Sequence, residues 1–598
     1  MSTSEGNTPN RSLECVATVA VDDMGLVVAL LQLNPTVGDL EGNAAEVERA
    51  VALAAANGAD LAITSELVIS GYPPRDLLLD SEFVERCAEV AENIETPIPL
   101  IVGTPLPPSN DRHLPSNGSM RIVPGRKAKV ATRKQLLPTY DVFDELRYFA
   151  PDKASGILRL SDSLSIGVTI CEDAWQHAGQ VPADYDADPI EQLAAWQHQG
   201  EPLELSVNLS SSPYHLHKEG TRGDVVRAAA KTLGHPFLLC NQVGGNDDLL
   251  FDGRSLAAWP DGRLVQAPAW CMGVMLVDIE DDSSTRWLPW PDGECCEECT
   301  CAIEFMDNEK EPAIPETGRD LLAAITTGIG DYCRKSGIKK LVLGMSGGLD
   351  SSVCAAIAVR AVGAENVLGM AMPSRYSSEH SLADAKATAQ ALGMELHVHS
   401  ISNLHDAAEE ELNEELTNGN PVARENIQSR LRGMMVMAAA NSLGAMAITT
   451  GNKSELAMGY CTLYGDMVGG YAPLGDLYKS EVYEVARALN NEAEKFGQTP
   501  PITESTMTKP PSAELAPDQK DQDTLPPYET LDSILEAHIE AGVSSSKLIA
   551  AGHDEKLVNW ILDRLHANEH KRWQMSPAPR VSRRAFGQGW RQPLAAIK

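Results

Sequence analysis

The sequence predicts an α/β protein of two or three domains in which parallel strands alternate with helices. The chain has 598 residues, more than one hydrophobic core usually serves. In the first half, an apolar run from Met24, a helical pattern over 43–56 and an apolar run over 60–64 predict strand, helix and strand. In the second half, apolar runs at 341–345 and 366–372 lead into helical patterns, which predicts a doubly wound parallel sheet with its ligand at the carboxyl ends of the strands.

Composition suggests where the domains begin and end. Residues 1–23 are polar and unpatterned, so we expect a disordered extension, or a chain that truly starts at Met24. Residues 291–315 are rich in Pro, Cys and acids without periodicity, which predicts a linker. The two domains are therefore expected at 24–290 and 316–598.

The charge balance bears on which partners the chain can have. Lys and Arg number 49 against 84 Asp and Glu, a net charge of −35, so most of the surface should repel nucleic acid and anionic membranes. The longest apolar runs, such as 25–31, are too short to cross a bilayer. The twelve cysteines lack the regular spacing of a secreted disulfide framework. We expect a soluble, cytoplasmic protein with no nucleic-acid or membrane partner.

Two segments depart from this background. Cys295, Cys296, Cys299 and Cys301 could hold zinc, but their spacing lacks a second knuckle, and a linker with incidental cysteines is the default. Residues 570–598 contain seven Lys or Arg and no acid. This basic end is either a solvated tail or a segment that folds onto an anionic ligand or an acidic neighbouring surface.

The most informative stretch is 340–356, KLVLGMSGGLDSSVCAA. A short buried strand over 341–345 precedes the run 346–352 of small and hydroxyl-bearing residues, and a helical pattern resumes at Val353. Gly347 and Gly348 permit close approach of the backbone, and N–H groups at a helix start favour anions. The pattern predicts a phosphate site, with an ordinary Gly-Ser turn as the alternative.

An acid within this loop implies a metal. The Lys-Ser/Thr pair of a Walker loop is missing, and Asp350 would repel phosphate unless a cation came between them, so Mg²⁺ is expected. SGGLDSS resembles the pyrophosphate loop of ATP pyrophosphatases, which adenylate a substrate and release pyrophosphate.

In the first half, three reactive residues lie at or near the ends of predicted strands: Glu66, Lys134 and Cys171. A carboxylate could take the thiol proton, the thiolate could attack an amide carbonyl, and the ammonium could stabilise the oxyanion. Taken singly, each could equally be a surface ion or a buried thiol.

The surrounding motifs TSELVISGYPPRDLL, KQLLPTYDVFDELRYF and GVTICEDAW resemble the glutaminase members of the nitrilase superfamily. The resemblance implies an α-β-β-α sandwich with Glu66 as general base, Lys134 as electrostatic stabiliser and Cys171 as nucleophile. It also implies that glutamine contacts Tyr140, Ser212 and Lys218. Asp141 stands where the family pattern has Gly, which could alter a turn beside the glutamine site.

The second half carries ENIQSRLR, TTGNKSE, KPPSAEL and EHKRWQ, which together with SGGLDSS resemble the synthetase domain of the glutamine-dependent NAD synthetase family, with a Rossmann-like sheet. The likeness extends from Met24 over nearly the whole chain. It implies an ATP site made by Ser346, Gly347, Gly348, Leu349, Asp350, Ser351, Ser352, Thr450, Lys479 and Ser512. It further implies deamido-NAD contacts from Asn426, Arg430, Glu455, Asp466 and Lys571, with Asp350 and Glu455 holding Mg²⁺.

The resemblance implies a carbon–nitrogen ligase with two sites. Glutamine would be cleaved at Cys171, ATP would adenylate the nicotinate carboxylate of deamido-NAD, and ammonia, carried between the sites inside the protein, would displace AMP. A homo-oligomer is also expected. Another ATP-pyrophosphatase amidotransferase, such as a GMP or asparagine synthetase, would not account for KPPSAEL. A non-catalytic nitrilase-like module fused to a nucleotide sensor would not need Glu66, Lys134 and Cys171 together.

Overall fold

The structure, a computed structural model, describes residues 25–108, 113–160, 164–200, 202–291, 302–306, 317–420, 422–510 and 525–596. The expected extension 1–23 and the cluster Cys295, Cys296, Cys299 and Cys301 lie outside these residues. The chain divides into two compact units, the first made of Met1–Asn246 and Phe251–Ile314, the second of Asp247–Leu250 and Pro315–Lys598. No described helix has the length and apolar character needed to cross a membrane.

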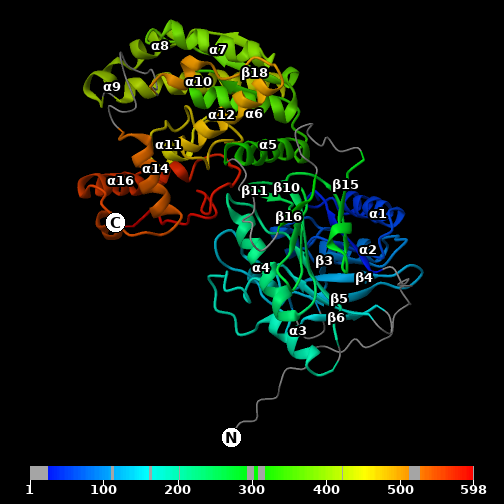
Figure 1. The fold of residues 1–598 in the computed structure, drawn as a ribbon. Coiled ribbons are helices and arrows are strands. Elements are labelled where there is room, and N and C mark those ends of the chain that lie inside the picture. The colour runs from blue at the N-terminus through cyan, green and yellow to red at the C-terminus, as the bar shows by residue number, and fades with distance from the viewer. Residues whose placement is uncertain are drawn as a thin grey trace. The chain divides into compact units, whose positions relative to one another are not determined.

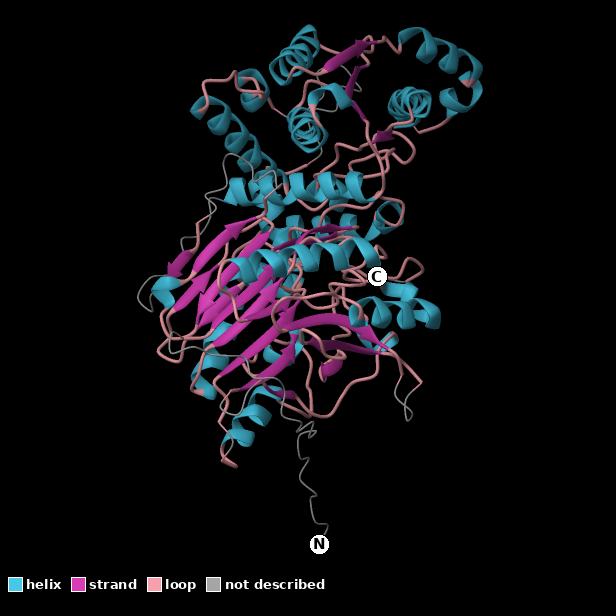
Figure 2. Cartoon of the chain, turned by 90° about the vertical axis from the view of Figure 1, so that its right-hand side faces the viewer, coloured by secondary structure: helices cyan, strands magenta, loops and turns pink. Residues whose placement is uncertain are grey.

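Strands dominate the first unit, as Figure 2 shows in magenta. They form two seven-stranded sheets, ordered β15-β14-β1-β2-β3-β4-β5 and β16-β13-β12-β9-β8-β7-β6, and there is also a two-stranded ribbon, β10-β11. The strands of the first sheet are β1 Val27–Gln32, β2 Leu61–Thr64, β3 Leu100–Leu106, β4 Ser116–Ile122, β5 Lys129–Arg133, β14 Gly273–Asp278 and β15 Arg286–Pro289. Those of the second sheet and the ribbon are β6 Gly156–Arg159, β7 Ser165–Ile170, β8 Leu205–Ser210, β9 Phe237–Asn241, β10 Val243–Asn246, β11 Leu249–Asp252, β12 Leu256–Ala258, β13 Leu264–Gln266 and β16 Glu304–Met306.

Four helices cover the outer faces of the two sheets: α1 Leu40–Ala56, α2 Ser81–Glu92, α3 Pro189–Gln197 and α4 Lys218–Leu233. Apolar side chains of α1 and α2 pack on the first sheet, those of α3 and α4 pack on the second, and a third core lies between the sheets. Figure 1 shows these two helix pairs on opposite sides of the strands. The expected α-β-β-α sandwich is confirmed.

A strand lies inside the segment that the sequence suggested as a linker. Residues Glu304–Met306 form β16, which pairs antiparallel with β13. Met306 is buried in the core beneath α3 and α4. These three residues of 291–315 therefore belong to a sheet. A strand of three residues is too short to produce a periodic pattern in the sequence.

The second unit contains a four-stranded parallel sheet ordered β19-β18-β17-β20, so the predicted doubly wound sheet is confirmed. Its strands are β17 Leu341–Gly344, β18 Val367–Ala371, β19 Glu395–Val398 and β20 Met446–Ala447. The strand order reverses between β17 and β20, where folds of this type bind ligands. The helices are α5 Thr317–Lys335, α6 Leu349–Val362, α7 Glu379–Leu392, α8 Ser402–Glu411, α9 Asn413–Asn418, α10 Val422–Leu443, α11 Lys453–Met458, α12 Lys479–Lys495, α13 Glu504–Thr508, α14 Tyr528–Ile539, α15 Ser545–Ala550, α16 Glu555–Ala567 and α17 Glu569–Arg572.

The helix after β17 starts earlier than the sequence suggested. It was expected at Val353, but α6 begins at Leu349, with Gly348 as its N-cap. Asp350, Ser351 and Ser352 therefore lie in its first turns rather than in a loop. The apolar pattern could not reveal this start because these polar residues carry no helical periodicity of their own.

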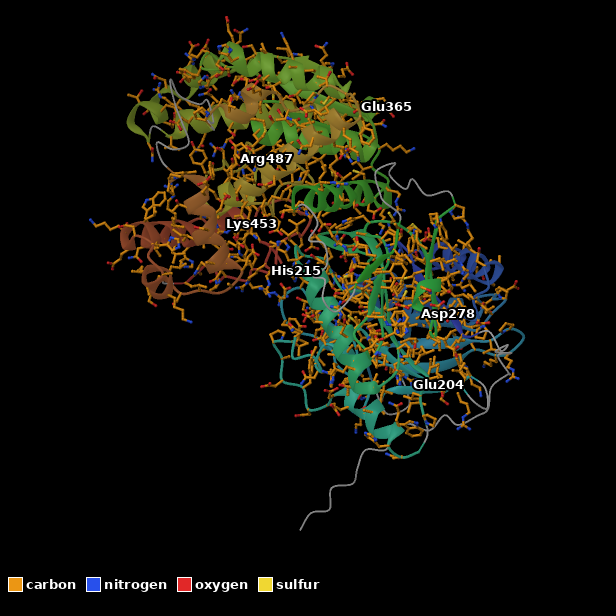
Figure 3. The ribbon with its side chains drawn as sticks, in the orientation of Figure 1. Glu204, His215, Asp278, Glu365, Lys453 and Arg487 are labelled. Atoms are coloured by element: carbon orange, nitrogen blue, oxygen red, sulfur yellow. The ribbon has the colours of Figure 1, made fainter. Side chains whose placement is uncertain are left out.

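Residues 576–590 of the basic C-terminal segment are largely buried and fold onto two acids, whereas 591–596 are mostly exposed. The N–H groups of Val581 and Ser582 donate to Asp476 at 2.8 Å, and that of Arg583 donates to Glu540 at 3.1 Å. Lys453, labelled in Figure 3, is fully buried and contacts Asp476 at 2.9 Å and Glu540 at 3.0 Å. Ser582 joins this cluster by accepting a hydrogen bond from Lys453 Nζ at 2.6 Å and donating one to Asp476. The arginine Arg580 is buried and donates to backbone carbonyls of its own segment.

Candidate active sites

The first site lies where strands of the two sheets of the first unit end. Glu66 follows β2, Lys134 follows β5 directly and Cys171 follows β7 directly. Lys134 Nζ lies 2.7 Å from Glu66 Oε1, and neither side chain is exposed. Asn117 Nδ2, at 2.7 Å, and the Ser211 N–H, at 3.1 Å, also donate to Glu66. The carboxylate is therefore held in one orientation.

Cys171 completes this group. The backbone of Cys171 has φ +41°, a strained value for a residue with a side chain, and its exposed fraction is 5%. Burial and the negative charge of Glu66 raise the pKa of Cys171 well above its ordinary value, and the positive charge of Lys134 opposes them. The three expected residues thus interact, and the sulfur remains a thiol until a base takes its proton.

Asp173 joins the loop that carries Lys134 to the turn that carries Cys171. Its carboxylate accepts from the N–H groups of Gln135 at 3.1 Å, Leu136 at 2.9 Å and Ile170 at 3.1 Å. Burial raises the pKa of Asp173 to about 7, although the three N–H donors act to lower it. The side chain therefore holds together the two segments that carry Lys134 and Cys171.

A third buried charge, Glu145, was not expected from the sequence. Both carboxylate oxygens of Glu145 lie 2.9 Å from Lys134 Nζ, and the Tyr72 hydroxyl donates to Glu145 at 3.0 Å. Burial raises the pKa of Glu145 above its ordinary value. For Lys134, burial alone would lower the pKa, but the negative charges of Glu145 and Glu66 outweigh that effect, so the pKa of Lys134 is raised. Glu145 lies in a short 3-10 turn, Glu145–Arg147, so no strand end marked it.

The residues expected to contact glutamine surround the same site. The Tyr140 hydroxyl donates to Glu172 at 2.8 Å, and Tyr185 donates to the same oxygen at 3.1 Å. Lys218 Nζ lies over the Trp175 ring at 5.3 Å and donates to the Pro213 carbonyl. Ser212 Oγ is buried without a hydrogen-bond partner among the described residues.

The turn beside Tyr140 is compatible with the residue that departs from the family pattern. Asp141 has φ +54°, in the left-handed region that glycine favours. Asp is among the few residues that adopt this conformation at modest cost, so the substitution retains the turn.

In the second unit, a cavity of about 340 Å³ opens beside the loop after β17. Its lining includes many of the expected residues: Ser346, Gly348, Leu349, Asp350, Ser351, Thr450, Glu455, Asp466 and Lys479. Two expected ATP residues, Gly347 and Ser352, do not line it: Gly347 faces Ser381, and Ser352 is fully buried beside Thr388. Ser512 lies outside the described residues.

The two expected Mg²⁺ ligands, Asp350 and Glu455, both lie near the ammonium group of Lys479. Lys479 Nζ lies 2.5 Å from Asp350 and 3.6 Å from Glu455, and Asn452 Nδ2 donates to Asp350 at 3.1 Å. Carboxylate oxygens are the protein ligands that Mg²⁺ prefers, so this donor set fits the ion.

Four of the residues expected to bind deamido-NAD gather around the segment 459–466. Lys571 donates to the Gly459 and Cys461 carbonyls at 2.7 Å, and Arg430 to the Leu463 carbonyl at 3.2 Å. Thr462 links the other two, donating through its hydroxyl to Asn426 and through its N–H to Asp466. Asn426, Arg430 and Lys571 lie outside the cavity lining, and Glu455 lies within it.

Comparisons with known proteins agree with this two-site architecture. The carbon-nitrogen hydrolase family matches residues 27–287, and the NAD synthase family matches residues 321–575. The glutamine-dependent NAD(+) synthetase of Synechocystis sp. is 42% identical over 95% of this chain and 98% of its own length, and that of Thermotoga maritima is 36% identical over the same shares. The solved structure of the Acinetobacter baumannii glutamine-dependent NAD+ synthetase with adenosine diphosphate has a TM-score of 0.70 at 31% identity, covering 95% and 98% of the two chains. Another from Cytophaga hutchinsonii, at 20% identity and a TM-score of 0.73 over 96% and 98%, shares the fold. The chain belongs to the family of glutamine-dependent NAD(+) synthetases.

Proposed function

We propose that this chain converts deamido-NAD to NAD with ammonia taken from glutamine, in a reaction that cleaves ATP to AMP and pyrophosphate. The observation that carries the proposal is the pairing of two sites in one chain. One is the buried group of Glu66, Lys134 and Cys171, and the other is the cavity beside the pyrophosphate loop.

In the first unit, Glu66 takes the thiol proton as Cys171 attacks the side-chain amide of glutamine. Lys134 stabilises the oxyanion with a charge that is already fixed in place, which suits a site closed to water. As the tetrahedral intermediate collapses, Glu66 gives this proton to the departing nitrogen, so that ammonia leaves and a thioester remains. Glu66, again a carboxylate, then takes a proton from the water that hydrolyses the thioester to glutamate and frees the Cys171 thiol.

Glutamine recognition follows from the groups around Cys171. The Glu172 carboxylate, oriented by Tyr140 and Tyr185, matches the α-ammonium of an amino acid. Lys218 and the Ser212 hydroxyl match its α-carboxylate. Substrates without both charged groups should bind weakly.

In the second unit, Ser346 and Ser351 and the start of α6 bind the phosphates of ATP, with Lys479 beside them. Asp350 and Glu455 would hold Mg²⁺, which neutralises phosphate charge and the departing pyrophosphate. The nicotinate carboxylate attacks the α-phosphorus and pyrophosphate leaves. Ammonia then attacks the carbonyl carbon, loses a proton and displaces AMP. Residues around 459–466 position deamido-NAD.

We further propose that the chain works as a homo-oligomer in the cytoplasm. Helix α10 exposes Met434 and Met437, three residues apart on one face, by 53% and 37%, which favours contact with a second copy. Cys171 must stay reduced to react, which suits a reducing compartment. Sedimentation of the purified protein measures its mass, and a monomer at enzyme concentrations would contradict the first point.

The decisive experiment compares two nitrogen donors in wild type and Cys171→Ala, with deamido-NAD, ATP and Mg²⁺ present throughout. Wild type should make NAD from glutamine or ammonium, and the variant from ammonium alone. If wild type cleaves ATP to AMP with a different acid and makes no NAD, the proposed acceptor is wrong. If Cys171→Ala retains the glutamine reaction, the nucleophile is wrong.

A further inference from the structure

Lys509, the first residue of the KPPSAEL motif, is a basic side chain of the synthetase cavity that is not among the residues expected to bind a ligand. It follows the short helix α13, and it lines the same cavity as Ser346, Gly348 and Ser351 of the pyrophosphate loop. Its ammonium donates to the Gly347 carbonyl at 2.7 Å and contacts Asp384 on α7 at 3.1 Å. A positive charge therefore lies against the loop that should receive phosphate.

The two other basic side chains of this cavity lining are engaged differently. Lys479 is only 2% exposed and contacts two carboxylates, Asp350 and Glu455. Arg432 donates to the Met372 carbonyl at 3.0 Å. The Lys509 side chain is 29% exposed and contacts one carboxylate among the residues that the structure describes, so moving its charge to a new anion costs less.

The partners of Lys509 remain hydrogen-bonded when it leaves. Asp384 accepts hydroxyl hydrogen bonds from Thr503 at 2.9 Å and Ser505 at 3.1 Å. The Gly347 carbonyl has a second donor, the Thr506 hydroxyl at 3.4 Å. Because neither buried acceptor would lose its last donor, the ammonium can change partners without leaving an unpaired buried group.

We propose that Lys509 binds the phosphate chain of ATP and that Asp384 holds its charge in place while the site has no nucleotide. This inference rests on the proposed function of the cavity. On binding, Lys509 exchanges the Asp384 carboxylate for phosphate oxygens, a stronger anion for an ammonium. Asp384 therefore competes with ATP for the Lys509 ammonium. If the ion pair only held α13 against the loop, losing either residue would weaken ATP binding equally.

These two roles predict opposite behaviour of two variants. We expect Lys509→Met to weaken MgATP binding, measured by calorimetry on the full chain, by at least about tenfold, the loss of a charge-assisted hydrogen bond. Asp384→Asn should bind MgATP as tightly as wild type or more tightly, because it frees the ammonium. Lys556→Met, which removes an exposed lysine of α16, is the matched control and should bind like wild type.

Each outcome decides the question. Equal losses in Lys509→Met and Asp384→Asn would mean a structural latch, and unchanged binding in Lys509→Met would mean no contact with ATP; either result overturns the proposal. If Lys509→Met does not fold, Lys509→Gln replaces it, since glutamine keeps a donor for the Gly347 carbonyl and loses only the charge. Binding needs no turnover, so wild type that binds MgATP without making NAD would refute the proposed function and leave the test of Lys509 intact.

Discussion

At the scale of single residues, buried charge decides what the first unit can do. Lys134 lies between Glu66 and Glu145, and all three side chains are almost fully removed from water. A buried ion left without its partner costs several kcal/mol, so each member of such a group constrains the others. The arrangement therefore supplies a fixed positive charge and a fixed proton acceptor beside Cys171.

Glu145→Gln tests whether the third charge of this group matters to the reaction. The variant leaves Lys134 paired with Glu66 alone, so the ammonium and the proton acceptor hold each other more tightly. We expect the rate of glutamine hydrolysis to fall on the order of a hundredfold, typical of a disturbed oxyanion stabiliser, with ammonium-dependent NAD formation unchanged.

Glu204→Gln is the control for Glu145→Gln because Glu204 lies in the same unit with an exposed side chain. It should hydrolyse glutamine like wild type. Full glutaminase activity in Glu145→Gln would show that Lys134 and Glu66 suffice without the second carboxylate.

His235 gives the first unit a pH-dependent stability. Burial lowers the pKa of His235 to about 4, and its Nε2 lies 2.9 Å from Ser206 Oγ. The unfolded chain takes up a proton below about pH 6.5, and the folded chain only near pH 4. The stability contribution of this residue is therefore complete above pH 6.5 and is lost as the pH falls to 4, a change of about 3 kcal/mol.

Urea unfolding of wild type and of His235→Gln at several pH values between 4 and 7 gives the difference in their unfolding free energies. The unfolding of the first unit is monitored by the loss of glutaminase activity, assayed on dilution. The advantage of wild type should shrink steadily below pH 6.5. A constant difference across that range would mean that His235 has an ordinary pKa in the folded protein.

At the scale of elements, the pyrophosphate loop is shaped by its contact with the next helix. Gly347 has φ +78°, and a Cβ placed there would lie 2.0 Å from the Ser381 carbonyl oxygen in α7. The loop can therefore approach α7 only because the residue has no side chain. The sequence predicts that Gly347 lets the backbone approach a ligand closely, whereas in the structure the close approach is to Ser381 of α7.

Gly347→Ala should displace the loop and lower ammonium-dependent NAD formation by at least about tenfold, since a misplaced binding group costs that much or more. Gly337→Ala is the matched control, because Gly337 has a similar φ of +70° with nothing within 4 Å of a Cβ. Both variants carry the backbone cost of a positive φ, about 1–2 kcal/mol, and only Gly347→Ala adds the clash. Equal activities in the two would contradict a role for the Ser381 contact.

At the scale of the whole molecule, two chemistries occupy two units of one chain. Ammonia is mostly protonated at neutral pH and then cannot act as a nucleophile, so we predict that it passes between the sites without mixing with solvent. With saturating glutamine, ¹⁵N-labelled external ammonium should contribute little to the amide of NAD, measured by mass spectrometry. Label in the product in proportion to external ammonium would contradict this prediction. The ammonium reaction of Cys171→Ala, which must incorporate the label, is its control.

Much of this organisation could be predicted from the sequence. Apolar periodicity located α1, β2, β17 and β18, and family motifs located Glu66, Lys134 and Cys171 as well as the loop after β17. These features succeed because strand and helix patterns are local, and because reactive residues at strand ends sit within short, characteristic segments. Folding of the basic end onto acidic neighbours was left open as one of two alternatives.

Other features depended on contacts between distant segments. Glu145 reaches Lys134 through a turn with no pattern, β16 forms only by pairing with β13, and Lys509 meets Asp384 from 125 residues away. The layers, the family and the candidate reactive groups could be inferred without the structure, since they follow from short-range pattern and motif. Only the tertiary structure decided which charges are buried together and which remain able to change partners, because burial and electrostatic pairing are set by residues far apart in the chain.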